Sequence, residues 1–126
     1  MGFKYIHTKK APQVVGPYSP GVMSGNLVFV SGQMPIDPAT GDMITGDAGV
    51  KAAQCLKNVL GILEEVGLTA KNIVKSTIFL KDMNDFSLVN EAYAAFFDGN
   101  YPARSCVEVS RLPKDVEVEI EVIASC

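Results

Sequence analysis

The chain ends in a strongly alternating stretch, Val116-Glu117-Val118-Glu119-Ile120-Glu121-Val122-Ile123-Ala124. Successive side chains of a β-strand point to opposite faces of its sheet, so the alternation predicts a strand with one apolar face and one acidic face. The apolar face has to be buried against another layer of the protein. This stretch therefore predicts a sheet with a packed layer on one side, and the preceding sequence supplies candidates for that layer.

Two segments upstream have the period of amphipathic helices. Asp47 to Val66 repeats apolar residues at intervals of three and four, with Asp47 as a plausible N-cap and Gly67 as the C-terminal stop. A second helix is predicted to begin at Asn84 or Asp85. The residues that this second helix is predicted to bury are Phe86, Val89, Tyr93, Phe96 and Phe97.

Short runs of β-branched and aromatic residues predict the remaining strands. They cover Phe3 to Thr8, Leu27 to Ser31, Ile73 to Lys81 and Arg104 to Ser110. Proline and glycine are frequent between these runs, which predicts an ordered loop at Ala11 to Gly25 and a turn-rich segment with a hairpin edge at Pro35 to Gly46.

The resulting order is strands, helix, strand, helix, strands, within a single domain that spans residues 1–126. This order predicts the α+β class, with two helices packed on one face of a mixed sheet. The helices account for one face only. We therefore expect the other face of the sheet to lie in an interface between subunits.

Composition agrees with a small protein that associates with itself. Of the 126 residues, 48% are hydrophobic and 20% are charged, and the mean hydropathy is +0.19. A chain this short has much surface for its volume, so this apolar content favours a partner, most simply a second copy. The formal net charge is −3 and Lys9-Lys10 is the only basic pair, which argues against a nucleic-acid partner.

Targeting and metal-binding patterns are missing from the sequence. There is no run long enough to span a membrane and no apolar leader after Met1, so we expect a protein of the cytoplasm. Cys55, Cys106 and Cys126 are odd in number and far apart, and the single histidine, His7, has no ligand partner at a typical spacing. These features predict neither a disulfide framework nor a metal site.

Arg104 is the first candidate for chemistry, because it opens a predicted strand directly after the Tyr101-Pro102-Ala103 turn. A guanidinium binds a carboxylate through two parallel hydrogen bonds, which fix orientation as well as charge. Strand alternation places Arg104 on the same face as Cys106 and Glu108. The alternative is an ordinary salt bridge to a nearby glutamate, which is the commoner role of a surface arginine.

Glu119 is the second candidate, because it lies between two apolar residues of the final strand. Partial burial would raise the pKa of this carboxyl toward a value suited to proton transfer. The alternative is that Glu117, Glu119 and Glu121 form the solvated face of an edge strand, where their charges discourage aggregation. The pattern alone favours that alternative.

Three further features are candidates for a supporting role. Cys106 is either a small apolar filler or, given a basic partner, a nucleophile, and the pattern favours the filler. Gly16-Pro17-Tyr18-Ser19-Pro20 is a rigid turn that displays an aromatic ring with a hydroxyl. Ser31-Gly32-Gln33 follows a strand, and its glycine allows the backbone to approach a ligand closely. The alternatives for these two segments are turn formation and a tight crossing of strands.

Taken together, these motifs resemble the RidA/YjgF family of reactive-intermediate deaminases. Asn90 matches the helical asparagine of that family. The resemblance extends over nearly the whole chain, with no departure at a motif position. The stretches that carry it are Gly16-Pro17-Tyr18-Ser19-Pro20, Val28-Phe29-Val30-Ser31-Gly32-Gln33-Met34-Pro35, Pro102-Ala103-Arg104-Ser105-Cys106-Val107, Arg111-Leu112-Pro113-Lys114-Asp115 and Val118-Glu119-Ile120.

The resemblance implies a bacillus chorismate-mutase-like α+β fold and a homotrimer whose three sheets form an inner barrel. It also implies a site in each cleft between neighbouring subunits. There Arg104 would bind the substrate carboxylate, Glu119 would position or activate the attacking water, and Tyr18 of the adjacent subunit would close the pocket. The lining and supporting residues would be Ser31, Gly32, Cys106 and Asn90.

The activity implied by the resemblance is that of a 2-iminobutanoate/2-iminopropanoate deaminase in metabolite damage control. Such a hydrolase converts 2-aminoacrylate, 2-aminocrotonate and their 2-imino acid tautomers to 2-keto acids and ammonia, without a metal or other cofactor. The alternative is a regulatory trimer that binds a keto or amino acid without turnover. Family members have also been described as translation inhibitors with ribonuclease activity, but the acidic pI of about 5.0 argues against RNA here.

Overall fold

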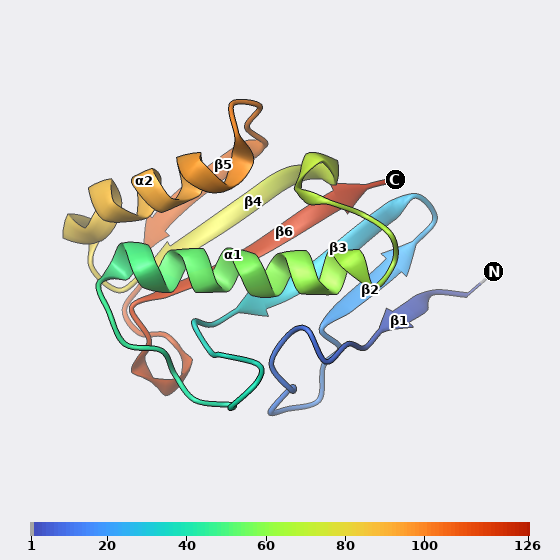
Figure 1. Cartoon of the computed structure of the whole chain (residues 1–126), viewed down its shortest axis with the longest axis horizontal. Helices are drawn as coiled ribbons and strands as arrows, with labels where there is room; N and C mark the ends of the chain where they lie inside the picture. The colour runs from blue at the N-terminus through green and yellow to red at the C-terminus, as the bar shows by residue number, and fades with distance from the viewer. Residues whose placement is uncertain (1) are drawn as a thin grey trace.

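In the computed structural model, which describes residues 2–126, six strands form one mixed sheet (Figure 1). The strand order is β1-β2-β3-β6-β4-β5. Neighbouring strands are antiparallel except β4 and β5, which run parallel. The strands are β1 (Lys4–Ile6), β2 (Gly21–Ser24), β3 (Leu27–Gln33), β4 (Ile73–Leu80), β5 (Ala103–Glu108) and β6 (Val118–Ser125).

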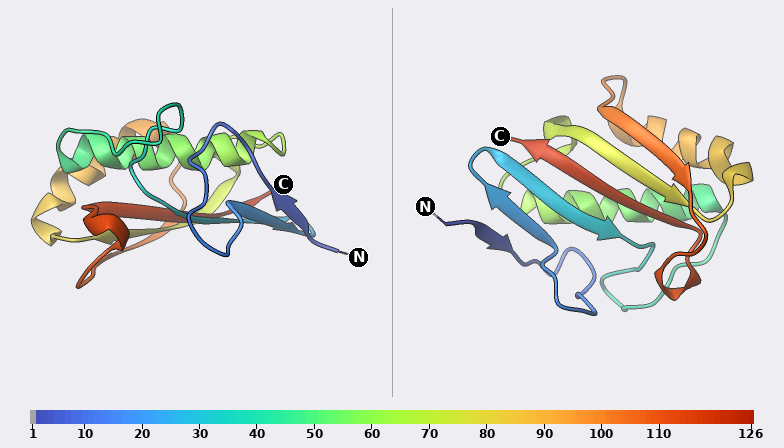
Figure 2. Two further views of the ribbon diagram at one scale, coloured as in Figure 1. Left: turned by 90° about the horizontal axis from the view of Figure 1, so that it is seen from below. Right: turned by 180° about the vertical axis from the view of Figure 1, so that it is seen from behind.

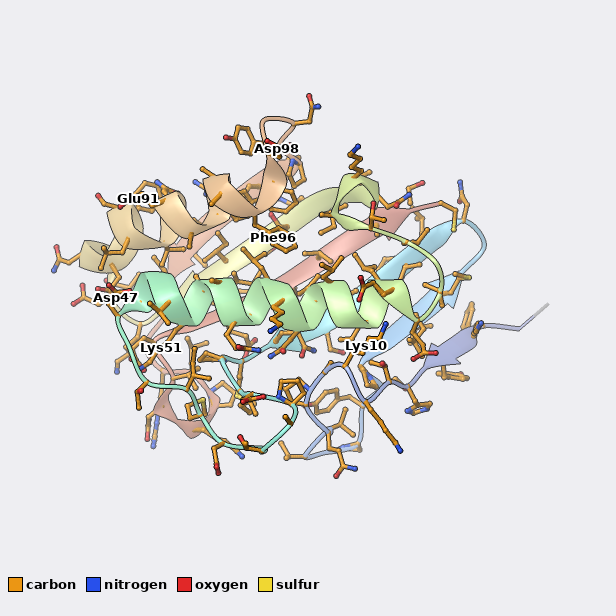
Figure 3. The ribbon with its side chains drawn as sticks, in the orientation of Figure 1. Lys10, Asp47, Lys51, Glu91, Phe96 and Asp98 are labelled. Atoms are coloured by element: carbon orange, nitrogen blue, oxygen red, sulfur yellow. The ribbon has the colours of Figure 1, made fainter. Side chains whose placement is uncertain are left out.

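Two helices, α1 (Ala48–Glu64) and α2 (Phe86–Phe97), lie on the same side of the sheet (Figure 2). The side chain of Asp47, labelled in Figure 3, caps α1 by accepting a 2.9 Å hydrogen bond from the Val50 backbone N–H. Beyond the helix, Gly67 has φ +76°, a left-handed conformation that suits glycine. Both predicted ends of α1 are therefore confirmed.

The core lies between the helices and the sheet. In β6 the alternation is confirmed, because its apolar residues are buried beneath α1, and those residues are Val118, Ile120, Val122 and Ala124. The α1 side of the core contributes mostly aliphatic residues, including Leu56, Val59, Ile62 and Leu63. The α+β class with two helices on one sheet face is thus confirmed.

The prediction of a loop over Ala11 to Gly25 was wrong at its end, where β2 pairs with both β1 and β3. The proline and glycine residues around β2 are typical of loops, so the local sequence did not indicate a strand there. Close packing explains why this strand contains a glycine, since a Cβ at Gly21 would lie 3.0 Å from Ile62 of α1. The predicted hairpin edge in Pro35 to Gly46 is a single bridge between Ile36 and Met43.

A second correction concerns the last strand. The alternative that β6 is a solvated edge strand was wrong, because β6 lies between β3 and β4 near the middle of the sheet. Glu117 precedes β6 and forms an ion pair with Lys51 of α1, so it does not share a face with Glu119 and Glu121 (Lys51 is labelled in Figure 3). The acidic face of the strand is thereby reduced to two carboxylates.

The face of the sheet turned away from α1 and α2, here called the open face, carries apolar as well as acidic side chains. Phe29 and Val107 are 43% and 42% exposed there, and strand register places Ile123 and Phe79 beside them. Within residues 2–126 no helix packs on this side. No helix among these residues is long and apolar enough to cross a membrane.

Candidate active site

Arg104 lies near the start of the edge strand β5, between two aromatic rings of α2. Its guanidinium carbon is 4.9 Å from the ring centroid of Tyr93 and 5.6 Å from that of Phe86. The strand holds the backbone of Arg104 in a fixed position, and both rings lie at distances typical of cation–π contacts. The position of this arginine is therefore set by a strand and a helix together.

Asn90 completes the surroundings of this arginine. Its side-chain oxygen accepts a 2.7 Å hydrogen bond from Nη1 of Arg104. Among residues 2–126 no carboxylate lies within ion-pair distance of Arg104, so the alternative of a salt bridge to a nearby glutamate was wrong. The guanidinium keeps its charge and most of its N–H donors for another partner.

A cavity of about 360 Å³ opens beside Arg104. Its other lining residues come from α2 and from the turn that leads into β5, namely Asn90, Tyr93, Ala94, Tyr101 and Pro102. Apolar walls with one cation and one amide suit a small ligand that has a carboxylate group and a short apolar side chain. The cavity is wide and open, so a chain on its own leaves a ligand partly exposed.

Cys106 lies two residues beyond Arg104 on the same face of β5 and is half-buried. Burial raises the pKa of its thiol, and the nearby charge of Arg104 only partly offsets that effect. A thiol held protonated is a poor nucleophile. The structure therefore favours the interpretation of Cys106 as a lining residue.

Glu119 occupies a different surface. Its side chain lies beside Gly32, in a β-bulge of β3. In this bulge Ser31 and Gly32 together face Glu121, because Val30 pairs with Val122 and Gln33 with Ile120. Bulges of this kind re-aim side chains and are frequent beside active sites. A Cβ at position 32 would clash with the carboxylate of Glu119, so Gly32 makes the space in which that carboxylate lies.

The carboxyl of Glu119 is half-buried and has a raised pKa. Desolvation by burial is the main cause, and the like charge of Glu121 adds to it. A carboxylate with a raised pKa is a stronger base than an exposed one, which suits it to accept a proton from water. The pKa direction expected from the sequence is thus confirmed.

Ser31 connects the bulge to the turn at residues 16–20. Its hydroxyl donates to the Ser19 carbonyl at 2.6 Å, and its backbone N–H donates to the Pro20 carbonyl at 2.9 Å. The ring of Tyr18 remains 44% exposed and lines a small pocket with Gly32 and Gln33. The hydroxyl of Ser31 is therefore occupied in holding the Tyr18 turn against the bulge.

The predicted site residues thus form two groups. Arg104, Asn90 and Cys106 make an arginine half-site, and the carboxylate half-site consists of Glu119, Gly32, Ser31 and Tyr18.

The two half-sites lie on opposite faces of the sheet. Arg104 pairs in register with Ser76 of β4, which faces α2, whereas Glu119 pairs with Phe79 of the same strand. Positions 76 and 79 differ by an odd number, so their side chains point in opposite directions. One chain therefore does not bring Arg104 and Glu119 together.

Two residues that contact Arg104 were predicted only as helix core. Phe86 and Tyr93 flank the guanidinium, and they share a helix face with Asn90 at intervals of four and three residues. That spacing, set around the predicted site residue Asn90, was the available signal.

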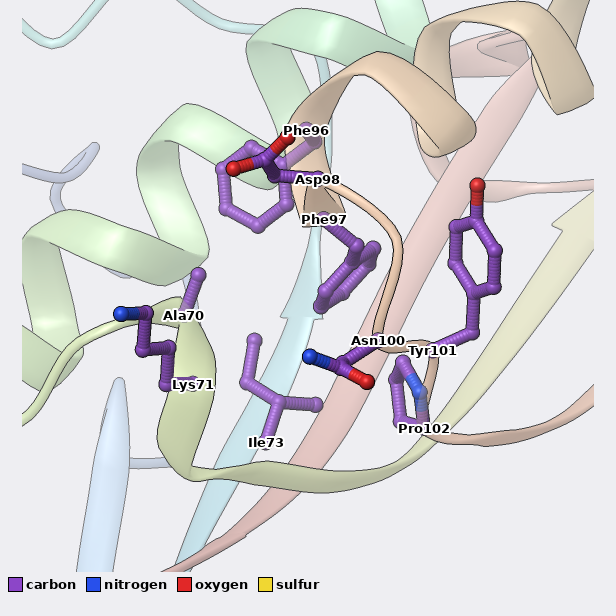
Figure 4. Close-up of a pocket in the computed structure, with 9 residues that line it drawn as sticks. All are labelled: Ala70, Lys71, Ile73, Phe96, Phe97, Asp98, Asn100, Tyr101 and Pro102. Carbon is purple, nitrogen blue, oxygen red and sulfur yellow. The ribbon is translucent and has the colours of Figure 1, made fainter.

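A second cavity, of about 370 Å³, adjoins the first along the Tyr101-Pro102 turn (Figure 4). Ala70, Lys71 and Ile73 lie on one side of it, and Asn100 to Pro102 lie on the other. None of the predicted site residues lines this cavity. It therefore belongs to neither half-site.

Fold and site together define a class of small α+β protein with an aromatic-flanked arginine on one surface and a half-buried glutamate on another. Comparison with known proteins gives the family. The family model described as Endoribonuclease L-PSP matches residues 8–126. The chain therefore belongs to the Endoribonuclease L-PSP family, and the predicted RidA/YjgF resemblance is confirmed.

Relatives match over nearly their full lengths. A RutC family protein of Haemophilus influenzae is 56% identical, with 94% of each chain covered. The 2-iminobutanoate/2-iminopropanoate deaminase of Escherichia coli strain K12 is 52% identical, with 96% of each chain covered. Among solved structures, that of Escherichia coli TdcF with bound serine has a TM-score of 0.94 at 48% identity, covering 98% of each chain.

Proposed function

We propose that this protein hydrolyses small 2-imino acids and their enamine tautomers to 2-keto acids and ammonia, at a site shared by two copies of the chain. The observation that carries the proposal is the separation of Arg104 from Glu119. Arg104 is held by Asn90 and has donors available for a carboxylate, and Glu119 has a raised pKa that suits a base. Within one chain, however, the two side chains point to opposite faces of the sheet. A second copy can supply what is missing.

The geometry supports a contact between unlike surfaces. The arginine half-site lies at a sheet margin, on the edge strand β5, whereas the carboxylate half-site lies by the open face of β6. If the margin of one copy packs against the open face of the next, each contact joins one arginine to one glutamate. Contacts between unlike surfaces close into a ring when the rotation from one copy to the next returns to the first. The family resemblance suggests a ring of three.

In this shared site the arginine would orient the substrate. Arg104 has N–H donors free to form two parallel hydrogen bonds with a carboxylate, which fix the plane of the adjoining C=N group. The apolar wall made by Tyr101 and Pro102 would accept the short side chain. Such fixed orientation removes much of the entropic part of the barrier.

The glutamate would then act on water. For an enamine, protonation at the β-carbon first gives the 2-imino acid. Water adds to the imine carbon as the Glu119 carboxylate takes its proton, and the π electrons move to nitrogen. Proton transfer to that nitrogen lets the carbinolamine expel ammonia while the carbonyl forms. General acid–base help of this kind contributes about a hundred- to ten-thousandfold in rate.

The names of the relatives support this proposal. One relative at 52% identity is named as the deaminase for 2-iminobutanoate and 2-iminopropanoate, and another holds serine, a small amino acid with a carboxylate. The bound serine also favours the alternative of a regulatory trimer that binds such ligands without turnover. A ribonuclease fits less well, because the chain has a net charge of −3. The trimer, the location in the cytoplasm and the role in metabolite damage control stay predictions.

Subunit mixing tests the proposal directly. Arg104→Ala and Glu119→Gln are each expected to lose imine hydrolysis when assembled alone. If the two variants are unfolded together in equal amounts and refolded, random assembly puts an intact arginine beside an intact glutamate at about a quarter of the contacts (one half times one half). The mixture should therefore recover about a quarter of the wild-type rate of ammonia release.

The controls are each variant refolded alone and the two mixed without unfolding. A mixture that stays inactive, although wild-type protein refolded in the same way is active, would rule out the shared site. Wild-type protein that binds 2-ketobutyrate but does not accelerate ammonia release would establish the regulatory alternative instead.

A further inference from the structure

We infer that Tyr93, held by Ser76, is a positioning residue that sets the plane of the Arg104 guanidinium for carboxylate binding. The inference rests on the proposed function, in which Arg104 binds the substrate carboxylate. It assigns a task to two buried hydroxyl groups that the proposed mechanism does not use. Neither residue would touch the reacting atoms.

The two hydroxyl groups lie in the core between α2 and β4. Ser76 is fully buried, and only 4% of Tyr93 is exposed. Their oxygens are 2.5 Å apart, so each satisfies the other. Packing alone does not call for this pair, because α2 presents Phe96 and Phe97 to the same region without any hydroxyl.

The pair stands directly behind the arginine. Ser76 on β4 is the register partner of Arg104 on β5, so both side chains leave the sheet on the same side. Tyr93 spans the space between them, with its hydroxyl on Ser76 and its ring 4.9 Å from the guanidinium carbon. The hydrogen bond therefore holds the far end of the ring against β4 and keeps the ring from swinging away from the cation.

A fixed ring has a consequence for the arginine. The guanidinium presents its N–H donors in one plane, and a carboxylate meets two of them only if that plane is correctly turned. Asn90 holds one end of the group through Nη1, and the ring of Tyr93 supports it from the side. Without the Ser76 hydrogen bond, the ring can swing away, and the guanidinium can then turn about the Asn90 contact.

A purely structural role for the pair makes a different prediction. Removing one hydroxyl leaves the other buried without a partner, which destabilises the protein, whereas removing both is close to neutral for stability. Under a structural role, activity should follow stability and return in the double variant. Under the positioning role, activity should stay low, because the ring remains free to swing away from the guanidinium.

The experiment compares Ser76→Ala, Tyr93→Phe and the double variant in the full chain. We expect each single variant to melt below the wild type and the double variant to regain most of that loss. All three should show kcat/KM for imine hydrolysis lowered about tenfold, mainly through KM, because the arginine binds ground state and transition state alike. The Kd for 2-ketobutyrate, measured by calorimetry, should rise by a similar factor.

Ile62→Val is the matched control, since Ile62 is fully buried on α1 and lies against Gly21 of β2, whereas Arg104 is on β5 at the other edge of the sheet. It should lower the melting temperature and leave KM unchanged. A double variant with wild-type KM and wild-type Kd would overturn the positioning role. If the wild type binds 2-ketobutyrate but does not release ammonia, the proposed function fails, and the Kd series still decides whether Tyr93 positions Arg104.

Discussion

Glu119 and Glu121 are identical side chains two positions apart on β6, yet their surroundings differ. Glu119 is half-buried against Gly32, whereas Glu121 is exposed. Burial first, and the neighbouring charge second, raise the pKa of Glu119. At the scale of the residue, the space left by Gly32 has thus given two identical side chains different surroundings.

This difference predicts a pH dependence. In the proposed mechanism, activation of water needs Glu119 ionised. We therefore expect kcat/KM to fall as the pH drops through its raised pKa, above the ordinary value of 4.5. Glu121→Gln removes the smaller of the two causes and should move the acidic limb to lower pH. The measurement is kcat/KM against pH for wild type and variant on one substrate, so that titration of the substrate cancels. A limb that does not move would mean that another group carries the proton.

Gly32 makes a second prediction at this scale. In Gly32→Ala the new methyl group would occupy the place of the Glu119 carboxylate, which would have to move. We expect imine hydrolysis to fall about a hundredfold, the loss that misplacement of a reacting group by about 1 Å can cause. Steady-state kinetics and melting temperature measure the two effects separately. Gly2→Ala, where a Cβ meets nothing, is the control, and equal rates in both variants would contradict the assigned space.

At the scale of the element, α1 holds the end of β3 in place through a buried amide. Asn58 is fully buried, and its Nδ2 donates to the carbonyls of Met34 and Ile36 at 3.1 and 2.9 Å. Its Oδ1 accepts a 2.9 Å hydrogen bond from Gln54, one turn earlier. The helix thereby anchors the segment that follows the Ser31-Gly32 bulge.

Asn58→Ala should therefore be costly. Two backbone carbonyls would lose their partner in the core, and we expect the free energy of unfolding to fall by about 2–3 kcal/mol. Gln54→Ala removes only the outer hydrogen bond and should cost about 1 kcal/mol. Urea denaturation followed by circular dichroism gives both values. Equal losses in the two variants would show that the carbonyl anchor contributes nothing of its own.

At the scale of the whole molecule, the two faces of the sheet are covered differently. One face of the sheet is covered by α1 and α2 (Figure 2). The open face combines large apolar side chains with the carboxylate of Glu119. Exposed apolar patches of this kind mark surfaces that bind another protein. The proposed assembly would cover this face and complete the active site in one step.

If the open face both joins the subunits and completes the active site, a change that breaks the assembly should also abolish activity. Phe29→Glu places a charge on the open face without touching either half-site. It should give a folded monomer with no imine hydrolysis, as measured by sedimentation and by ammonia release. Val50→Glu, at an equally exposed position on α1, is the control and should keep both properties. A Phe29→Glu monomer with full activity would show that one chain suffices.

Much of the fold could be predicted from local patterns. The period of Asp47 to Val66 and the alternation of Val116 to Ala124 depend on which side chains must be buried, and both were confirmed. β2 could not be predicted, because its four residues are flanked by proline and glycine and it is a strand only through pairing with β1 and β3. Pairing between distant segments leaves little trace in a short local sequence.

For the site, the sequence by itself determined the candidate residues, because Arg104, Glu119 and Gly32 occur in motifs that resemble a known family. Only the tertiary structure decided which of them meet. Strand order put β6 inside the sheet, and register turned Arg104 and Glu119 to opposite faces. Helix packing placed Tyr93 and Phe86 around the guanidinium. The physical reason is that a side chain's direction follows from local alternation, whereas its neighbours follow from which distant strands and helices pack together.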